Sequence, residues 1–210
     1  MKLLLVGASG LVGQQVLQQA LANPAIERVT APTRKALAAA AKLDNPVIDF
    51  ERLPEGAPWW AADAVICTLG TTMAQAGSES AFRRVDHDYP LAVARLARAA
   101  GATAFVLNSA LGAAAGSRVF YNRVKGDVEA AISALGYPSL TLVRPSLLDG
   151  GPRADKRRGE RLGLLVARLL RPLIPARYRA VGTDAVARTL LAAALTRPPG
   201  VHIIESEQIA

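Results

Sequence analysis

The stretch that decides the fold is VGASGLVG, residues 6 to 13, in which Gly7, Gly10 and Gly13 have the spacing GxxGxxG. It follows the apolar run Leu3–Val6, typical of a strand buried on both faces, and precedes Leu11–Ala22, whose apolar residues recur at helical period. Between a strand and a helix, the first glycine permits a tight turn, the second lets the backbone approach a pyrophosphate, and the third allows close packing. The stretch predicts a nucleotide site, with a tight turn that binds nothing as the alternative.

The pattern of a short apolar strand followed by a helix repeats along the chain. Further strands are predicted at Ile26–Ala31, Pro46–Asp49, Ala64–Leu69, Ala104–Asn108, Leu140–Val143 and His202–Glu205. Helices are predicted at Ser78–Ala100, Val119–Leu135 and from an N-cap at Thr183 to about Leu195. This alternation predicts an α/β protein with a doubly wound parallel sheet. With the glycine loop in its first strand–helix turn, we expect this sheet to be an NAD(P)-binding Rossmann fold. We expect one domain over residues 1–210, with a small helical, arginine-rich cap at 150–182.

Composition excludes several classes of protein. The 210 residues are 51% hydrophobic, enough for a sizeable core. A single cysteine, Cys67, excludes an internal disulfide, and two histidines, His87 and His202, lack the spacing of a zinc site, so no metal is expected. The N-terminus lacks the features of a secretory signal, and Leu162–Leu170 is far shorter than the ~20 residues of a membrane span. We therefore expect a cytoplasmic protein that does not enter a membrane.

The net charge of +8 is concentrated in one segment. Residues 151–180 hold nine basic and two acidic residues, a local +7, which leaves +1 for the remainder. An apolar stripe at helical spacing predicts an amphipathic helix over Gly159–Arg171, with its cations outward. Three interpretations stay open: solvated faces of a cap, a pocket for an anionic substrate, or a surface for an acidic protein partner. Nucleic acid is disfavoured, because aromatic residues make up only 5% of the chain.

The end of the second strand indicates which dinucleotide is bound. An acidic residue there would accept hydrogen bonds from a ribose 2′-hydroxyl, but VTAPTRK, residues 29–35, ends in Thr33, Arg34 and Lys35. Two cations suit a 2′-phosphate better than a bare ribose, so NADP(H) is favoured over NAD(H). The alternative is an ordinary solvated basic loop.

A tyrosine and a lysine stand four residues apart in YNRVK, residues 121–125. In a helix this spacing puts Tyr121 and Lys125 on one face, about one turn apart. A cation beside a phenol favours the phenolate and readies the hydroxyl to give or take a proton. The pair also occurs by chance in many helices, as an aromatic residue beside a solvated lysine.

With the glycine loop and YNRVK in this order, the chain resembles the short-chain dehydrogenase/reductase superfamily. Within it, the chain is most similar to the atypical members that include the Tat-interacting-protein oxidoreductases. The resemblance runs from residue 1 to about residue 149 and continues more weakly through the helix start at residues 183–187. It rests on CTLGTT (67–72), RVDHDYPLA (84–92), the serine of LNSALGA (107–113), YNRVKGDVEA (121–130) and VRPSLL (143–148).

The resemblance implies roles for matching residues. Tyr121 would exchange a proton with a carbonyl or alcohol, Lys125 would hold the nicotinamide ribose, and Ser109 would hydrogen-bond the substrate oxygen. The remaining cofactor contacts would be Gly7, Ser9, Gly10, Leu11 and Val12 at the pyrophosphate, Arg34 and Lys35 at the 2′-phosphate, Asp49 and Phe50 at the adenine, Thr68, Leu69 and Gly70 at the ribose side, and Leu107, Asn108, Pro145, Ser146, Leu147 and Leu148 around the nicotinamide.

Two departures from the resemblance limit this transfer. Asp86 stands where many relatives carry an asparagine that helps to relay protons behind the lysine. Only about 30 residues separate Asp149 from the Thr183 helix, which is little room for a nucleotide-sugar substrate. We therefore expect an NADP(H)-dependent oxidoreductase acting on a small carbonyl or alcohol. The rival hypothesis is a catalytically weak NADP(H)-sensing or scaffold protein that binds a protein partner through its arginine-rich segment.

Overall fold

The computed structural model describes residues 1–149 and 175–209, which contain a parallel sheet of seven strands. In spatial order the strands are β3 (Leu43–Asp44), β2 (Arg28–Thr30), β1 (Lys2–Val6), β4 (Ala64–Cys67), β5 (Ala104–Asn108), β6 (Ser139–Arg144) and β9 (Gly200–Glu205). Strands β7 (Leu148–Asp149) and β8 (Val181–Gly182) form a separate parallel pair. The order reverses between β1 and β4, which confirms the predicted doubly wound fold and puts a binding crevice at the carboxyl ends of these strands.

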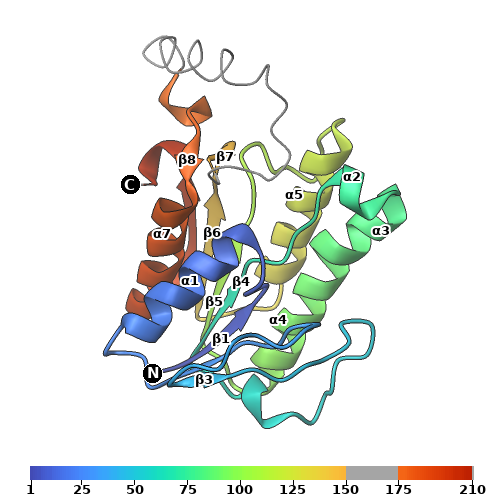
Figure 1. Ribbon diagram of the computed structural model, residues 1–210. Helices are drawn as coiled ribbons and strands as arrows, with labels where there is room; N and C mark the ends of the chain where they lie inside the picture. Colours follow the sequence, from blue (N-terminus) through green and yellow to red (C-terminus); the bar gives the residue numbers. More distant parts are fainter. Residues whose placement is uncertain (150–174, 210) are drawn as a thin grey trace, which may run out of the picture.

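In the part of the chain that the structure describes, four long helices cover the two faces of the sheet (Figure 1). Helices α1 (Leu11–Ala22) and α7 (Thr183–Thr196) pack together on one face, and α4 (Tyr89–Ala99) and α5 (Phe120–Ser133) lie on the other. Shorter helical segments are α2 (Met73–Ala76), α3 (Glu79–Arg83), a π-helical turn at Arg84–Asp88, and 3-10 turns at Pro58–Trp60, Ala176–Tyr178 and Ser206–Gln208. Helix α1 has the predicted bounds.

The core consists of two apolar layers separated by the sheet. Alternate residues of each strand point to opposite faces, so Leu3 and Leu5 join the layer under α1 and α7, whereas Leu4 and Val6 join the layer under α4 and α5. Trp60 lies almost fully buried in the second layer, where its indole N–H donates to the Pro54 carbonyl over 2.8 Å.

Most of the other strands and helices begin or end within one or two residues of the predicted bounds, but one strand, one helix and one N-cap differ from the prediction. The third strand is Leu43–Asp44 rather than Pro46–Asp49, because Pro46 has no N–H to extend the ladder and Val47 makes only an isolated bridge with Thr33. The helix predicted over Ser78–Ala100 is broken by the π-helical turn. At α7 the N-cap is Gly182, and Thr183 is already the first helical residue.

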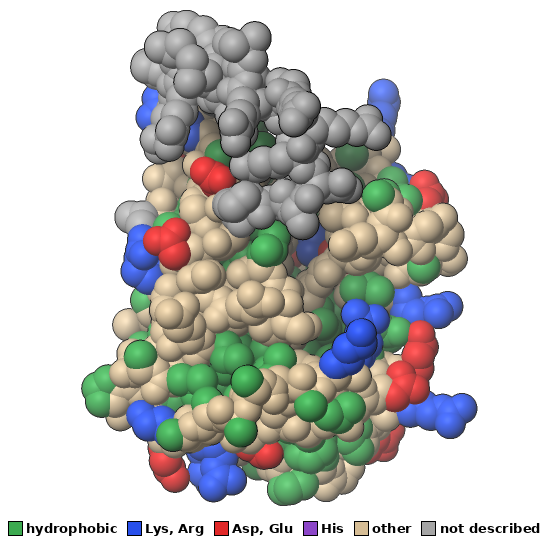
Figure 2. All heavy atoms as spheres, in the orientation of Figure 1, with side chains coloured by type: hydrophobic (Ala, Val, Ile, Leu, Met, Phe, Trp, Pro, Cys, Tyr) green, Lys and Arg blue, Asp and Glu red, His purple; other side chains and the backbone are tan. Residues whose placement is uncertain are grey.

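The predicted amphipathic helix at Gly159–Arg171 lies outside the described residues, as does most of the predicted cap. On the face drawn in Figure 2, basic and acidic side chains of the described part are interspersed along the margins. This mixed surface agrees with the small net charge that the sequence assigns to the chain outside residues 151–180.

Candidate active site

Two positions of the glycine loop after β1, Gly7 and Gly13, have no room for the Cβ atom of any other residue. Gly7 has φ of +91°, and a Cβ atom there would lie 2.7 Å from the backbone carbon of Thr68. A Cβ on Gly13 would lie 2.0 Å from the Gly7 carbonyl oxygen. Gly10 differs, since its Cβ would lie at 3.4 Å from that oxygen and clash with nothing. The first and third glycines therefore serve packing, and the second borders open space.

The N-terminus of α1 fits a phosphate group. Its N-cap is Gly10, which offers no side-chain cap, and its first turn holds no acidic residue. Ser9, Gly10 and Leu11 are exposed, whereas Val12 is buried against the sheet. Because the first amides of a helix lack partners within the helix, this end can donate hydrogen bonds to an anion. Of the predicted pyrophosphate residues, Val12 can contribute only its backbone.

Two free cations follow β2. Arg34 and Lys35 are exposed, and neither forms an ion pair within residues 1–149 and 175–209. Their loop is held by Asn45, whose amide nitrogen donates to the Ala31 carbonyl and to Thr33 Oγ1. The structure therefore presents both cations on an ordered loop, although sequence reasoning missed Asn45, whose partners become neighbours only through the fold.

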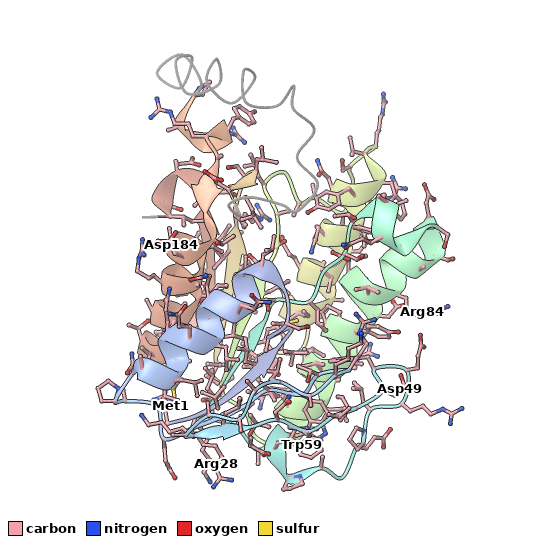
Figure 3. The ribbon with its side chains drawn as sticks, viewed as in Figure 1. Met1, Arg28, Asp49, Trp59, Arg84 and Asp184 are labelled. Atoms are coloured by element: carbon pink, nitrogen blue, oxygen red, sulfur yellow. The ribbon has the colours of Figure 1, made fainter. Side chains whose placement is uncertain are left out.

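The predicted adenine residues lie in the loop that follows Val47. The Phe50 side chain is buried, and its ring centroid is 5.8 Å from that of Tyr89, so only its backbone can face a base. Asp49 accepts a hydrogen bond from the Glu51 amide at 2.9 Å. Glu51 in turn accepts from Arg84 at 3.2 Å, which ties this loop to the π-helical turn; Figure 3 shows Arg84 and Asp49 on the same side of the molecule.

A buried ion pair lies at the end of β4, beside the predicted ribose residues. Thr68 donates through Oγ1 to the Val6 carbonyl, and the next residues, Leu69 and Gly70, lead past Lys125. The Lys125 ammonium is 2.8 Å from Asp86 Oδ1, and both side chains are almost fully buried. Burial alone would lower the pKa of Lys125, but the charge of the nearby Asp86, with a smaller effect of Tyr121, outweighs it and raises that pKa.

Tyr121 lies at the mouth of the site, one turn of α5 before Lys125. Its side chain is 38% exposed, and its ring centroid is 5.6 Å from that of Phe82. The phenol lies near enough to Lys125 to act on the charge of that ammonium. Gly126 lets α5 pack closely on the loop after β5, since a Cβ atom at this position would lie only 2.1 Å from the carbonyl carbon of Ala114.

Ser109 belongs to a buried hydrogen-bond network. Its hydroxyl donates to Glu129 Oε1 over 2.5 Å. Arg144 donates to both oxygens of Glu129 and, at 2.9 Å, to Glu205, and these carboxylates raise the pKa of Arg144. While its proton points to Glu129, Ser109 can only accept a hydrogen bond from a substrate or from Tyr121. Sequence reasoning missed Glu129, although it follows Lys125 by four residues and so shares its helix face.

The residues predicted around the nicotinamide differ in exposure. Leu107 and Pro145 are buried. Asn108 Oδ1 is buried and has no hydrogen-bond partner among the described residues, so it can accept from a ligand. The Ser146 amide is not free to donate to a ligand, because it already donates to Ser206 Oγ. Leu147 is 75% exposed. Leu148 begins β7 and is half-buried.

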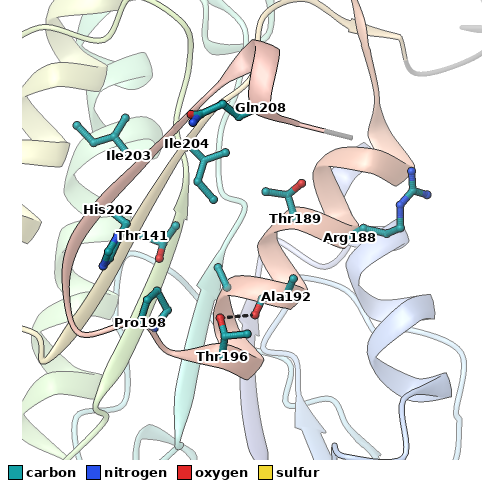
Figure 4. Close-up of a pocket in the computed structure, with 11 residues that line it drawn as sticks. Thr141, Arg188, Thr189, Ala192, Thr196, Pro198, His202, Ile203, Ile204 and Gln208 are labelled. Atoms are coloured by element: carbon teal, nitrogen blue, oxygen red, sulfur yellow. Dashed lines mark hydrogen bonds between the residues drawn. The ribbon is translucent and has the colours of Figure 1, made fainter.

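A groove in the described part of the chain lies apart from this site. It has a volume of about 590 Å³ and runs between α7 and β9, where Arg188, Thr189, His202 and Gln208 line it (Figure 4). None of the predicted site residues borders it. Over the described ranges, no three His, Cys, Asp or Glu side chains are grouped to hold a metal ion. No helix within those ranges is long and apolar enough to cross a membrane.

The sheet order, the glycine loop and the helix that follows it define a dinucleotide-binding protein of the Rossmann class. MoeE5 in complex with UDP-glucose and NAD has a similar fold, with a TM-score of 0.71 and 16% identity over 97% of this chain and 75% of that one. The oxidoreductase YlbE of Lactococcus lactis gives a TM-score of 0.68 and 16% identity over 100% of this chain and 94% of that one. At such identity the likeness establishes the fold alone.

Sequence relatives narrow the class to a family. Rat HTATIP2 is 39% identical over 149 residues, which are 69% of this chain and 61% of that protein. The mitochondrial protein FMP52 of Eremothecium gossypii is 34% identical over 218 residues, spanning 100% of this chain and 96% of that one. The chain belongs to the family of HTATIP2 and FMP52, an atypical NAD(P)-binding branch of the short-chain dehydrogenase/reductases. No family model matches the chain.

Proposed function

We propose that the protein is an NADP(H)-dependent oxidoreductase that acts on a small carbonyl or alcohol. The observation that carries the proposal is the placement of Lys125, buried one helical turn from Tyr121 at the carboxyl edge where the glycine loop opens. A proton-exchanging phenol beside a fixed cation is the chemistry that carbonyl reduction needs at oxygen.

Each residue of the site has a task in this reaction. A bound nicotinamide cofactor supplies the hydride at carbon. Tyr121, at the exposed mouth, gives its hydroxyl proton to the substrate oxygen in reduction and takes it back in oxidation. Lys125 holds the ribose hydroxyls with its ammonium. Ser109 donates its own proton to Glu129, so its oxygen keeps free lone pairs. Through these it accepts a hydrogen bond from the hydroxyl group of the substrate or of Tyr121, and so orients that group.

The preference for NADP(H) rests on Arg34 and Lys35. Both are exposed and unpaired in the described part of the chain, on a loop fixed by Asn45. A 2′-phosphate offers them a charge-assisted contact that a bare ribose lacks. The small size of the proposed substrate rests on chain length, since only about 30 residues lie between Asp149 and Thr183. The cytoplasmic location stays a prediction, because the FMP52 relatives are named as mitochondrial.

The reaction is tested with Tyr121→Phe, which removes one hydroxyl. With NADPH and a panel of small aldehydes and ketones, we expect turnover to fall by at least about a hundredfold while the Kd for NADPH changes less than about threefold. Tyr137→Phe is the matched control, because the Tyr137 hydroxyl donates to the Ala94 carbonyl in the core. Equal turnover in Tyr121→Phe and wild type would refute the role of Tyr121. NADPH binding without any wild-type turnover would favour the cofactor-sensing alternative.

The cofactor preference is tested by thermal shift with NADPH and NADH side by side. A ligand that binds only the native state raises the Tm with the logarithm of concentration over Kd. We expect the larger shift with NADPH, and Arg34→Ala should abolish the difference. Arg28→Ala is the control, since Arg28 is exposed at the opposite end of β2. Equal shifts of the wild type with both cofactors would contradict the assignment of Arg34.

A further inference from the structure

Asp86, at the position where many short-chain dehydrogenase/reductases carry an asparagine, lies in the centre of the site in the described structure. It lies in the π-helical turn Arg84–Asp88, which widens the helical run between α3 and α4 by one residue per turn. Its side chain is 1% exposed. A carboxylate so deeply buried is costly unless its oxygens are satisfied.

Both oxygens of Asp86 have partners from other elements. Oδ1 is 2.8 Å from the Lys125 ammonium on α5. Oδ2 accepts a hydrogen bond of 2.8 Å from the amide of Thr71, in the loop after β4. A Cβ on Gly70 would lie 3.3 Å from Oδ1, so this loop packs directly on the ion pair. The carboxylate thus joins the lysine to the loop that carries the predicted ribose contacts.

We propose that Asp86 is a positioning residue that fixes the charged ammonium of Lys125 against the β4 loop by a direct ion pair, which takes the place of a relay through an asparagine. The proposal rests on the proposed function, since it assumes that Lys125 holds the cofactor. Asp86 itself need not touch the cofactor, because it acts through Lys125.

The charges around Lys125 decide what the loss of Asp86 would do. The titratable groups acting on its ammonium are Asp86 from the π-helical turn, Tyr121 from the same helix and Cys67 from the end of β4. Cys67 is a neutral thiol, because burial raises its pKa to about 12. Asp86 is therefore the main counter-charge. Without it, burial favours the neutral amine of Lys125, which becomes a weaker hydrogen-bond donor as pH rises.

The test is a double-mutant cycle of Asp86→Asn and Lys125→Met, read out as the Kd for NADPH from about pH 6.5 to about pH 9.5. In the wild type we expect little change with pH. In Asp86→Asn we expect the Kd for NADPH at about pH 9.5 to be at least about tenfold higher than the Kd at about pH 6.5. In the Lys125→Met background, Asp86→Asn should change the Kd less than about threefold at any pH.

A purely structural role for Asp86 predicts a different result: a loss of affinity that is the same at every pH and additive in the double variant. Either observation overturns the proposal. Asp127→Asn is the matched control, since Asp127 lies on α5 with Lys125 and pairs with Arg83 at the surface over 2.8 Å. Its pH profile should follow that of the wild type.

Folding of the variants is followed by urea unfolding without cofactor. If Asp86→Asn alone does not fold, recovery of folding in the double variant supports the pairing, because the unpaired buried ammonium has been removed. Failure of the double variant, when Lys125→Met folds, counts against it. A wild type that binds no NADPH would end both this proposal and the proposed function, whereas an additive cycle alongside loss of turnover in Tyr121→Phe would end this proposal alone.

Discussion

At the scale of single residues, the glycine loop separates packing from binding. Gly13→Ala puts a Cβ atom 2.0 Å from the Gly7 carbonyl oxygen, so α1 must move, and we expect a loss of about 3 kcal/mol in the free energy of unfolding. Gly10→Ala meets that oxygen only at 3.4 Å and should fold with a loss below about 1 kcal/mol. Its methyl group enters the space for the phosphates, so its Kd for NADPH should rise at least about tenfold. Urea unfolding and fluorescence titration measure both effects. Nucleotide affinity unchanged in Gly10→Ala would contradict a phosphate site there.

The buried thiol of Cys67 makes the free energy of unfolding fall as pH rises in the alkaline range. Burial raises the pKa of its thiol from the ordinary value of 9.0 to about 12, an effect only partly offset by a hydrogen bond from the Leu69 backbone and by the charge of Lys125. The unfolded chain therefore loses this proton at lower pH than the native one, so the stabilisation is complete below pH 9 and is lost as pH rises toward 12.

We expect the wild type to lose about 1.4 kcal/mol per pH unit more than Cys67→Ala over this window. The measurement is the free energy of unfolding in urea at a series of pH values. The comparison cancels the tyrosines and lysines that both proteins share. Parallel curves would mean that the thiol is solvated in the native state.

Residue patterns along the chain predicted the packing glycines and the Tyr121–Lys125 pair, because each signal lies within a few positions of sequence. They could not predict where the Ser109 proton points. That direction depends on Glu129, Arg144 and Glu205, which come from three different elements and meet only in the folded sheet. The same holds for the pairing of Asp86 with Lys125, 39 residues apart in the chain.

At the scale of elements, Glu129 fastens α5 to the sheet. Its buried carboxylate accepts from Ser109 on the β5 side and from Arg144 of β6. Glu129→Gln leaves the guanidinium of Arg144 without its main counter-charge, and we expect a loss of about 3 kcal/mol in the free energy of unfolding. Glu205→Gln should cost less than about 1 kcal/mol, since Glu205 is partly exposed and Arg144 keeps Glu129. Chemical unfolding of both variants tests the ranking, and the reverse order would show that Glu205 is the stronger partner.

The elements themselves were predicted well where one local pattern sufficed. Helix α1 and strand β5 have the predicted bounds, since each lies between clear turn residues. The π-helical turn was not predicted, because the residues around it continue a helical pattern. The turn contains Asp86, whose partner Lys125 is distant in the sequence. Strand β3 was misplaced because the pairing partner of β2 depends on the loop that Asn45 closes.

At the scale of the whole molecule, the two core layers share every central strand and so should unfold together. Strand β1 gives Leu3 and Leu5 to one layer and Leu4 and Val6 to the other, so neither layer can lose its packing while the other keeps the strand. Trp59 and Trp60 pack in or against the layer under α4 and α5, whereas the far-ultraviolet circular dichroism signal reports helices on both faces. We expect tryptophan fluorescence and circular dichroism to give one coincident urea transition, with the same midpoint and the same slope. A fluorescence midpoint below that of circular dichroism would mean that the segment around Pro58–Trp60 detaches first, and that the layer under α1 and α7 is stable without it.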